Sequence, residues 1–168
     1  MSAFALRLAT AADLPAIVAI YNATIPGRMV TADLEPVTVE SRRTWFEAHQ
    51  NPARPLWVHC DANGTVGAWL SFDTFYPRAA YDGTAMIAIY VATTHRRLGL
   101  GKRLLNEALT RAPALGLHTL LGYIFGHNEP SLRLFESHGF ARWGHLPRVA
   151  VLDGTERDLV IVGRRLVP

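Results

Sequence analysis

The spacing of hydrophobic and polar residues changes repeatedly along this chain between a two-residue period and a 3.6-residue period. In seven segments, apolar residues alternate with polar ones or form short β-branched runs, which predicts strands. In four others they fall on one side of a 3.6-residue period, which predicts helices. The expected strands are residues 4–9, 56–60, 65–72, 85–91, 119–125, 141–151 and 158–164; the expected helices are residues 10–22, 39–49, 101–112 and 130–138. The order β-α-α-β-β-β-α-β-α-β-β is typical of an α/β fold.

Local signals support several of these boundaries. Thr10, with Asp13 three residues later, is typical of a helix N-terminus. Residues 61–64, Asp-Ala-Asn-Gly, predict a tight turn between two strands. Residues 25–36 and 74–83 are rich in turn formers and are expected to be long loops.

A short basic loop with two glycines follows the strand that ends at Val91. Residues 96–101 read Arg-x-x-Gly-x-Gly, and an amphipathic helix begins at their end. Such a loop directs backbone N–H groups and the positive end of a helix dipole to one point, which favours a pyrophosphate ligand. A P-loop is excluded because Arg103 stands where a magnesium-binding hydroxyl is needed. A dinucleotide fingerprint is excluded because Leu104 replaces its third glycine.

A second motif lies at residues 128–140 and reads Asn-x-x-Ser-x-x-Leu-Phe-Glu-x-x-Gly-Phe. Asn128 suits a helix cap, and Pro130 suits the first helical turn. Gly139 suits the left-handed residue that ends a helix, after which Phe140 enters a strand. The segment is therefore expected to be a short capped helix.

Composition excludes several classes of protein. The 168 residues suit one domain, residues 1–168. No apolar run approaches the ~18 residues that span a bilayer, and the first residues lack a secretory signal, so no membrane partner is expected. The net charge of +3 is too small to indicate a nucleic-acid partner. No histidine or cysteine spacing suits a metal ion, so no metal is expected.

The single cysteine, Cys60, excludes an internal disulfide. It lies in an apolar strand, so an inert core thiol is expected rather than a nucleophile. A chain without disulfides is consistent with a reducing compartment, and we expect a cytoplasmic protein.

The two motifs together resemble those of the GNAT superfamily of N-acetyltransferases. The resemblance covers the whole order of strands and helices. It implies a mixed sheet with a splayed central strand pair and acetyl-CoA as cosubstrate. The residues that it implies for acetyl-CoA binding are Ile89, Tyr90, Val91, Arg96, Arg97, Leu98, Gly99, Leu100, Gly101, Lys102, Asn128, Ser131 and Arg133.

Four further segments, residues 16–22, 31–38, 75–81 and 158–166, resemble the phosphinothricin acetyltransferase-like branch of that superfamily. Enzymes of this branch acetylate the amino group of small amino-acid-like compounds such as phosphinothricin, methionine sulfone and methionine sulfoximine. The resemblance implies a homodimer and a small-molecule amine as acceptor. The acceptor-binding residues that it implies are Thr31, Phe75, Arg78 and Tyr81, with Arg78 and Tyr81 on the substrate carboxylate.

The implied mechanism is direct transfer, in which the amine attacks the thioester and a backbone N–H near Val91 stabilises the oxyanion. The chain departs from the branch at two positions. Met86 stands where relatives have a glutamate, the proposed general base, and Phe135 stands where relatives often have a residue that protonates the leaving thiolate. Neither side chain can exchange a proton at neutral pH, so no catalytic side chain is assigned.

Three explanations remain open. A substitute base could serve, and the candidates are Asp73, Glu35, Asp82 and His145. Alternatively, the acceptor could be an amine of low pKa, for which a base contributes little. The third explanation is an acetyl-CoA-binding sensor or partner-binding module with weak or no catalysis.

Overall fold

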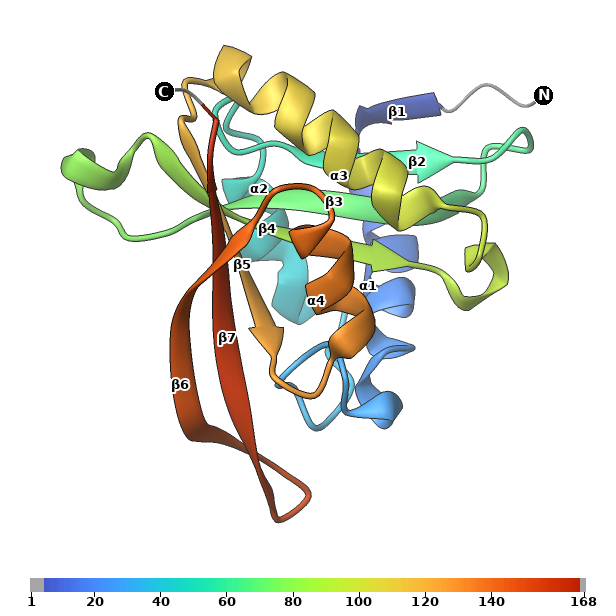
Figure 1. Ribbon diagram of the computed structural model, residues 1–168. Helices are drawn as coiled ribbons and strands as arrows, with labels where there is room; N and C mark the ends of the chain where they lie inside the picture. Colours follow the sequence, from blue (N-terminus) through green and yellow to red (C-terminus); the bar gives the residue numbers. More distant parts are fainter. Residues whose placement is uncertain (1–4, 167–168) are drawn as a thin grey trace.

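One mixed sheet forms the centre of the molecule (Figure 1). The computed structural model describes residues 5–166, and in that part seven strands are ordered β1-β2-β3-β4-β5-β7-β6. The parallel pair is β4 with β5; the other neighbours are antiparallel. The strands are β1 (Ala5–Leu8), β2 (Leu56–Cys60), β3 (Val66–Thr74), β4 (Thr84–Val91), β5 (Thr119–Phe125), β6 (Ala141–Leu152) and β7 (Thr155–Arg165). The predicted mixed α/β sheet is confirmed.

Helices cover both faces of the sheet. In Figure 1, α3 and α4 lie in front of the sheet, and α1 and α2 lie behind it. The helices are α1 (Leu14–Asn22), α2 (Arg43–Ala48), α3 (Leu100–Arg111) and α4 (Glu129–Glu136). Shorter 3-10 turns are Ala11–Asp13, Ile25–Gly27, Glu40–Arg42, Ala79–Tyr81, Thr93–His95 and Ala112–Leu115.

The two faces carry separate hydrophobic cores because successive strand residues point to opposite sides. In β3, Trp69 packs with Ile17 of α1 and Phe46 of α2. Leu70, the next residue, belongs to the larger core under α3 and α4, with Leu104 among its fully buried members. Burial on both sides fixes the register of the central strands, and with it the residues that face each helix layer.

Several boundaries differ from those expected. The first helix begins as a 3-10 turn, where Asp13 accepts the backbone N–H of Thr10 at 2.7 Å, as its capping signal predicted. The second is shorter than predicted, because Thr38 and Ser41 bond each other's backbone N–H groups and hold the preceding segment in a turn. Strand β7 begins earlier, at Thr155. Phe4, the expected start of the first strand, lies outside the described residues.

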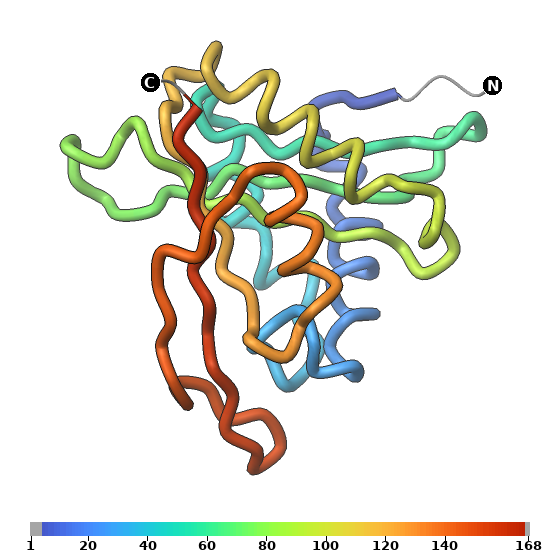
Figure 2. The backbone as a smooth tube through the Cα atoms, in the orientation of Figure 1, coloured from blue at the N-terminus to red at the C-terminus, as the bar shows by residue number. Residues whose placement is uncertain are grey.

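Two segments extend from the body of the molecule, as the backbone trace in Figure 2 shows. The segment between β3 and β4 projects to one side, and the long hairpin of β6 and β7 projects to another. Asp153 and Gly154 make the hairpin turn with φ angles of 49° and 79°, the left-handed region that a two-residue turn needs. Strand β6 forms the edge of the sheet and contains two register shifts.

Candidate active site

The central parallel pair separates after three residue pairs. Strands β4 and β5 pair from Thr84 with Thr119 to Met86 with Leu121, and then run apart, as Figure 1 shows. A cavity of about 70 Å³ lies in this gap. Its walls include the backbone of β4 from Ile87 to Tyr90 and the Phe135 ring of α4. The splayed strand pair expected from the sequence is therefore present.

Gly122 of β5 allows Phe135 to approach the gap closely. A Cβ atom at position 122 would lie 2.9 Å from the Phe135 ring, closer than such atoms come in proteins. Phe135 is buried and packs edge-on against Phe140, with 4.9 Å between ring centroids. The wall of the gap on this side is thus apolar.

A backbone donor faces the gap at the end of β4. The N–H of Ala92 donates to the Gly67 carbonyl on the β3 side, at 2.9 Å. Adjacent residues of a strand direct their N–H groups to opposite sides, so the Val91 N–H faces the β5 side, where no strand pairs with it. Such a donor can stabilise negative charge that develops on a carbonyl oxygen.

The loop after β4 presents the N-terminus of α3. Gly99 precedes the helix with φ 73°, a conformation that favours glycine, and Arg97 has φ 64°. No side chain caps this end, and the first intrahelical bond in the turn runs from Arg103 N–H to Gly99 carbonyl at 3.1 Å. The N–H groups of residues 100–102 therefore point outward without an intrahelical partner, as an anion site requires.

A second cavity connects this loop with the gap. Its volume is about 420 Å³, and it is lined by Arg96, by Ile89, Tyr90 and Val91 of β4, and by Asn128 and Ser131 of α4. Met29 and Val30, from the segment after α1, close its other side. The structure thus brings residues of both sequence motifs to one cavity.

Asn128 holds two walls of this cavity together. It is buried, its side-chain oxygen accepts the Ser131 N–H at 3.3 Å, and its amide donates to the Met29 carbonyl at 2.9 Å. The helix-capping role expected of Asn128 is confirmed. Arg133 lies apart from the cavity: its side chain is 79% exposed and pairs with Glu129 along the helix. Leu98 is also exposed, at 62%.

Met86 lies on the opposite face of β4, toward α1 and α2, in line with Ala88 and Tyr90. Directly across the β3–β4 ladder from Met86 is Asp73. The Asp73 carboxylate accepts from the Ser71 hydroxyl at 2.6 Å and from Trp45 Nε1 at 3.2 Å. A carboxylate therefore lies one strand away from the position that lacks one.

Thr31 belongs to a polar network on the same side. It is buried, and its hydroxyl hydrogen-bonds to the Tyr21 phenol, which donates to Asp33 at 2.5 Å. Asp33 also accepts from Arg42 at 3.0 Å, and the Arg42 guanidinium lies 4.7 Å from the Tyr21 ring centroid. Burial, with the hydrogen bond to Asp33, raises the pKa of Tyr21, so this phenol is neutral at neutral pH.

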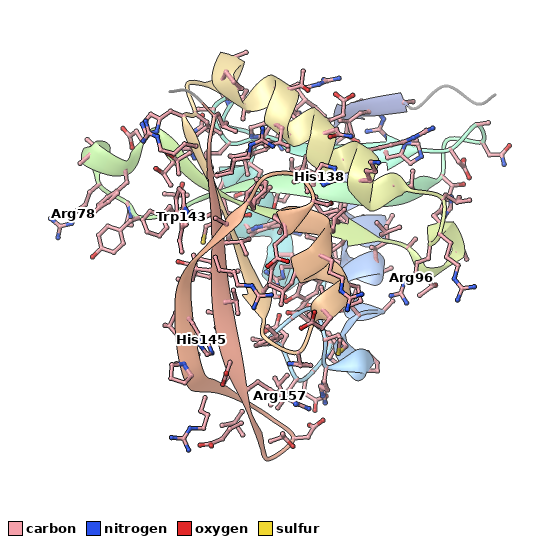
Figure 3. All side chains as sticks on the ribbon, in the orientation of Figure 1. Arg78, Arg96, His138, Trp143, His145 and Arg157 are labelled. Atoms are coloured by element: carbon pink, nitrogen blue, oxygen red, sulfur yellow. The ribbon has the colours of Figure 1, made fainter. Side chains whose placement is uncertain are left out.

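The other expected acceptor-binding residues lie in the projecting segment between β3 and β4. Phe75 and Tyr81 pack edge-on at 5.5 Å, and the Arg78 guanidinium lies 5.9 Å from the Tyr76 ring centroid. Figure 3 shows Arg78 at one extreme of the molecule and Arg96 at the other. Within one chain, Arg78 and Tyr81 therefore lie apart from the cavities beside β4.

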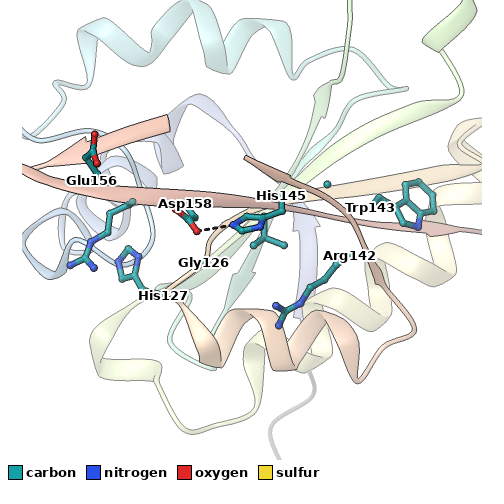
Figure 4. A pocket seen from close by; sticks show the side chains of 10 residues that line it. Gly126, His127, Arg142, Trp143, His145, Glu156 and Asp158 are labelled. Atoms are coloured by element: carbon teal, nitrogen blue, oxygen red, sulfur yellow. Dashed lines mark hydrogen bonds and ion pairs between the residues drawn. The ribbon is translucent and has the colours of Figure 1, made fainter. Parts of the chain in front are cut away.

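The alternative bases lie in different places. Glu35 is exposed in the loop before α2, and Asp82 is exposed beside the start of β4. His145 pairs in register with Val160, whose side chain faces the α4 layer, so His145 and Met86 are on opposite faces of the sheet. There His145 bonds Asp158 at 2.7 Å in a separate cavity of about 690 Å³ under the hairpin, as Figure 4 shows.

Sequence reasoning did not single out the aromatic and basic residues around Asp73. They come from α1, the 3-10 turn before α2, α2 itself, its C-terminal end and β3, and are Tyr21, Arg42, Trp45, His49 and Trp69. They have no common spacing in the sequence, and only the register of β3 against β4 brings Asp73 beside Met86.

Residues 5–166 contain no group of three or more metal-ligating side chains. In the same part of the chain, no helix has the length and apolar character needed to cross a bilayer. Cys60 is buried in β2 as expected, with its sulfur 3.4 Å from a guanidinium nitrogen of Arg7.

Known proteins match both the sequence and this geometry. Residues 16–140 match the Acetyltransferase (GNAT) family. YwnH of Bacillus subtilis (strain 168), a candidate phosphinothricin acetyltransferase, is 56% identical over 161 residues, covering 96% of this chain and 98% of that protein. The L-methionine sulfoximine/L-methionine sulfone acetyltransferase of Pseudomonas aeruginosa (strain PAO1) is 34% identical, covering 97% of this chain and 95% of that protein.

A solved structure agrees as well. The phosphinothricin acetyltransferase of Sinorhizobium meliloti in complex with acetyl-CoA superposes with a TM-score of 0.90, at 28% identity, over 96% of this chain and 88% of that one. The chain belongs to the acetyltransferase (GNAT) family. It is an N-acetyltransferase, and its cosubstrate is acetyl-CoA.

Proposed function

We propose that the enzyme transfers the acetyl group of acetyl-CoA directly to the primary amine of a small amino-acid-like compound. Phosphinothricin, methionine sulfone and methionine sulfoximine are the acceptors that the names of its relatives suggest. The observation that carries the proposal is the position of β4 between two cavities. One side of β4 borders the gap and the α3 N-terminus. The other side borders a small recess that is lined by Asp73, Trp45 and Tyr90.

The cosubstrate side fits acetyl-CoA. The unpartnered N–H groups at the start of α3, with Arg96, Arg97 and Lys102 nearby, suit a pyrophosphate. The free backbone edge of Ile89, Tyr90 and Val91 suits an extended, amide-bearing chain. Acetyl-CoA supplies the activated acyl group for this chemistry.

In this proposal the Val91 N–H polarises the carbonyl that is attacked. The neutral amine attacks the thioester carbonyl and forms the C–N bond, and the tetrahedral intermediate then collapses as the C–S bond breaks and CoA thiolate leaves. No residue of the chain is acetylated in between. An amine must lose a proton before it attacks, and the departing thiolate must gain one. Met86 and Phe135 can do neither, so the proton acceptor has to lie elsewhere or the amine must already be neutral.

The acceptor-binding segment supports a homodimer as part of the proposal. Phe75, Arg78 and Tyr81 line none of the cavities beside β4, so they would contact an acceptor only at the cavity of a second copy. Thr31, by contrast, lies within reach of the recess through Tyr21. We expect size-exclusion chromatography with light scattering to give twice the chain mass. We also expect the enzyme to act in the cytoplasm.

The test is thiol release from acetyl-CoA in the presence of methionine sulfone, methionine sulfoximine, phosphinothricin, a polyamine or a peptide with a free N-terminus. We expect release that depends on one or more of the first three amines, with the acetylated amine detected by mass spectrometry. The side chains of Met86 and Phe135 favour a second function, an acetyl-CoA-binding sensor. Tight acetyl-CoA binding without any acetylated amine would establish that alternative.

A further inference from the structure

A recess of about 160 Å³ lies under α1 and α2, against the face of β4 that carries Met86. Aliphatic and aromatic side chains form most of its wall, and one carboxylate and one cation, Arg42, also line it. The aromatic side chains are Tyr21, Trp45, Trp69 and Tyr90, and the carboxylate is Asp73. Aromatic faces and a carboxylate together attract an ammonium group. The Asp73 and Met86 positions are directly opposite in the ladder, which places their Cβ atoms about 5 Å apart.

His49, at the C-terminal end of α2, lies behind Asp73 and is buried. Its Nε2 is 3.2 Å from Asp73 Oδ1, and its Nδ1 is 2.8 Å from the Trp45 carbonyl oxygen. A carbonyl only accepts, so Nδ1 carries a proton. Nε2 then faces a carboxylate oxygen. Two unprotonated acceptors at this distance repel, so the resting pair holds one proton.

The directions of the pKa shifts of Asp73 and His49 agree with this arrangement. Burial alone would raise the pKa of Asp73, but the contacts with His49 and Ser71 outweigh it and hold that pKa below its ordinary value. Burial alone would lower the pKa of His49, but Asp73 and the Trp45 carbonyl outweigh it and raise that pKa. Each residue therefore sets the protonation state of the other.

The other ionisable groups that face this recess are a guanidinium and two phenols. Arg42, in the 3-10 turn before α2, pairs with Asp33. Burial raises the pKa of both phenols that face the recess, Tyr21 of α1 and Tyr90 of β4. Among the described groups of this recess, the pair of Asp73 and His49 therefore changes its protonation at a pH above the ordinary pKa of histidine.

We propose that Asp73 is the residue that accepts the proton of the acceptor's ammonium group, with His49 as its positioning residue. The inference rests on the proposed function and deepens it. The N–H bond of the ammonium breaks, an O–H bond forms on the Asp73 carboxylate, and the amine's electron pair becomes free to attack. A pair that already holds its proton cannot accept another, so transfer should rise as pH rises and the pair loses that proton.

The experiment compares four proteins: wild type, Asp73→Asn, Met86→Glu and the double variant. The acceptor is the amine that wild type acetylates fastest. Asp73→Asn should lower kcat by at least about 100-fold and flatten the rise of kcat/KM with pH. The double variant should have a kcat at least tenfold higher than Asp73→Asn, because Met86→Glu returns a carboxylate across the ladder. The matched control is Glu47→Gln, an exposed acid on the same helix as Trp45, which should stay within twofold of wild type.

Acetyl-CoA affinity and the melting temperature report whether each variant folds. If Asp73→Asn lowers the melting temperature strongly, Asp73→Glu is used instead. This variant keeps the carboxylate, so the rise of kcat/KM with pH should remain. Loss of that rise would indicate a purely structural role for Asp73. A readout independent of turnover is the NMR titration of His49. His49 should retain its proton to higher pH in wild type than in Asp73→Asn.

The outcomes separate the two proposals. Unchanged kcat in Asp73→Asn, or a His49 titration that is the same in both proteins, overturns the role of Asp73 while acetyl transfer itself stands. If wild type acetylates no amine, the proposed function and this inference both fail.

Discussion

The two sides of strand β4 are built in different ways. On the side of α3 and α4, the site consists mainly of backbone: the Val91 N–H, the free edge of β4, and the N–H groups at the start of α3. On the side of α1 and α2, it consists of side chains from four separate elements around Asp73. The first side keeps the backbone donors that the resemblance implies but has Phe135 where relatives often have a proton donor, and the second has Met86 where relatives have a base.

This difference indicates which of the two sides can change its chemistry from one related enzyme to another. A backbone site depends on the fold and on a few glycines, so it tolerates most side-chain changes and continues to bind the same cosubstrate. A side-chain site changes chemistry with a single substitution. The acetyl-CoA side is therefore expected to be conventional, and the acceptor side is expected to determine what is distinctive about this enzyme.

The largest effect is expected from Gly99→Asp on the backbone side. The substitution forces a non-glycine residue to φ 73° and puts a negative charge at the N-terminus of α3. The dissociation constant for acetyl-CoA should rise at least about 100-fold, measured by isothermal titration calorimetry. Gly116→Asp is the matched control: it has φ 77° and equally open surroundings but lies after α3, and it should leave the affinity unchanged. Normal affinity in Gly99→Asp would refute the assignment of this loop.

Asp13→Asn, on the side of α1, should lower the stability of the fold and leave acetyl-CoA affinity unchanged. The carboxylate binds Arg7 at 2.7 Å and the N–H of Thr10, and Asp13 is the last residue of the 3-10 turn that leads into α1. The hydrogen bond from Arg7 lowers the pKa of Asp13 from 3.8 to about 2. Arg7 is 46% exposed, so loss of the carboxylate should reduce the free energy of unfolding by about 1–2 kcal/mol at pH 7.

The pH dependence of that loss follows from the sign of the shift. A lowered pKa in the folded protein contributes stability above the ordinary value and loses it as pH falls toward about 2. Urea unfolding at pH 7, 5, 4 and 3 should show the two proteins converging below pH 4, with acetyl-CoA affinity equal throughout. A constant difference across this range would contradict the assigned role, and Asp153→Asn, in an exposed ion pair with Arg28, should give a smaller change.

A smaller effect is expected from Phe135→Tyr, which places a hydroxyl in the gap between β4 and β5. If protonation of the leaving thiolate limits turnover, kcat should rise by up to about tenfold, less than a fully evolved acid provides. Phe140→Tyr is the control, because Phe140 packs against Phe135 but does not line the gap. No change, or an equal change in both variants, would show that thiolate protonation does not limit the rate.

Sequence signals predicted the local structure on the side of α3 and α4. The positions that matter there are glycines, helix caps and strand ends, each with a local signal, as at Gly99 and Asn128. It could not predict how many pairs join β4 to β5, because the gap depends on how the two strands twist apart.

The acceptor side was less accessible to sequence reasoning. Asp73 was one of four candidate bases, and only the register across the ladder places it beside Met86. His145 was another candidate, but the register of β6 against β7 turns it to the opposite face. His49 and Trp45, which bond Asp73, were not singled out because their partner lies far along the chain, beyond any local pattern.

The most direct test of the central claim is a paired mass measurement on wild-type enzyme in excess over acetyl-CoA. Without amine, the protein should keep its unmodified mass and release no thiol. On addition of the preferred amine, thiol and acetylated amine should appear in equal amounts, as direct transfer requires. An acetylated protein before amine is added, or thiol release without acetylated amine, would contradict the account.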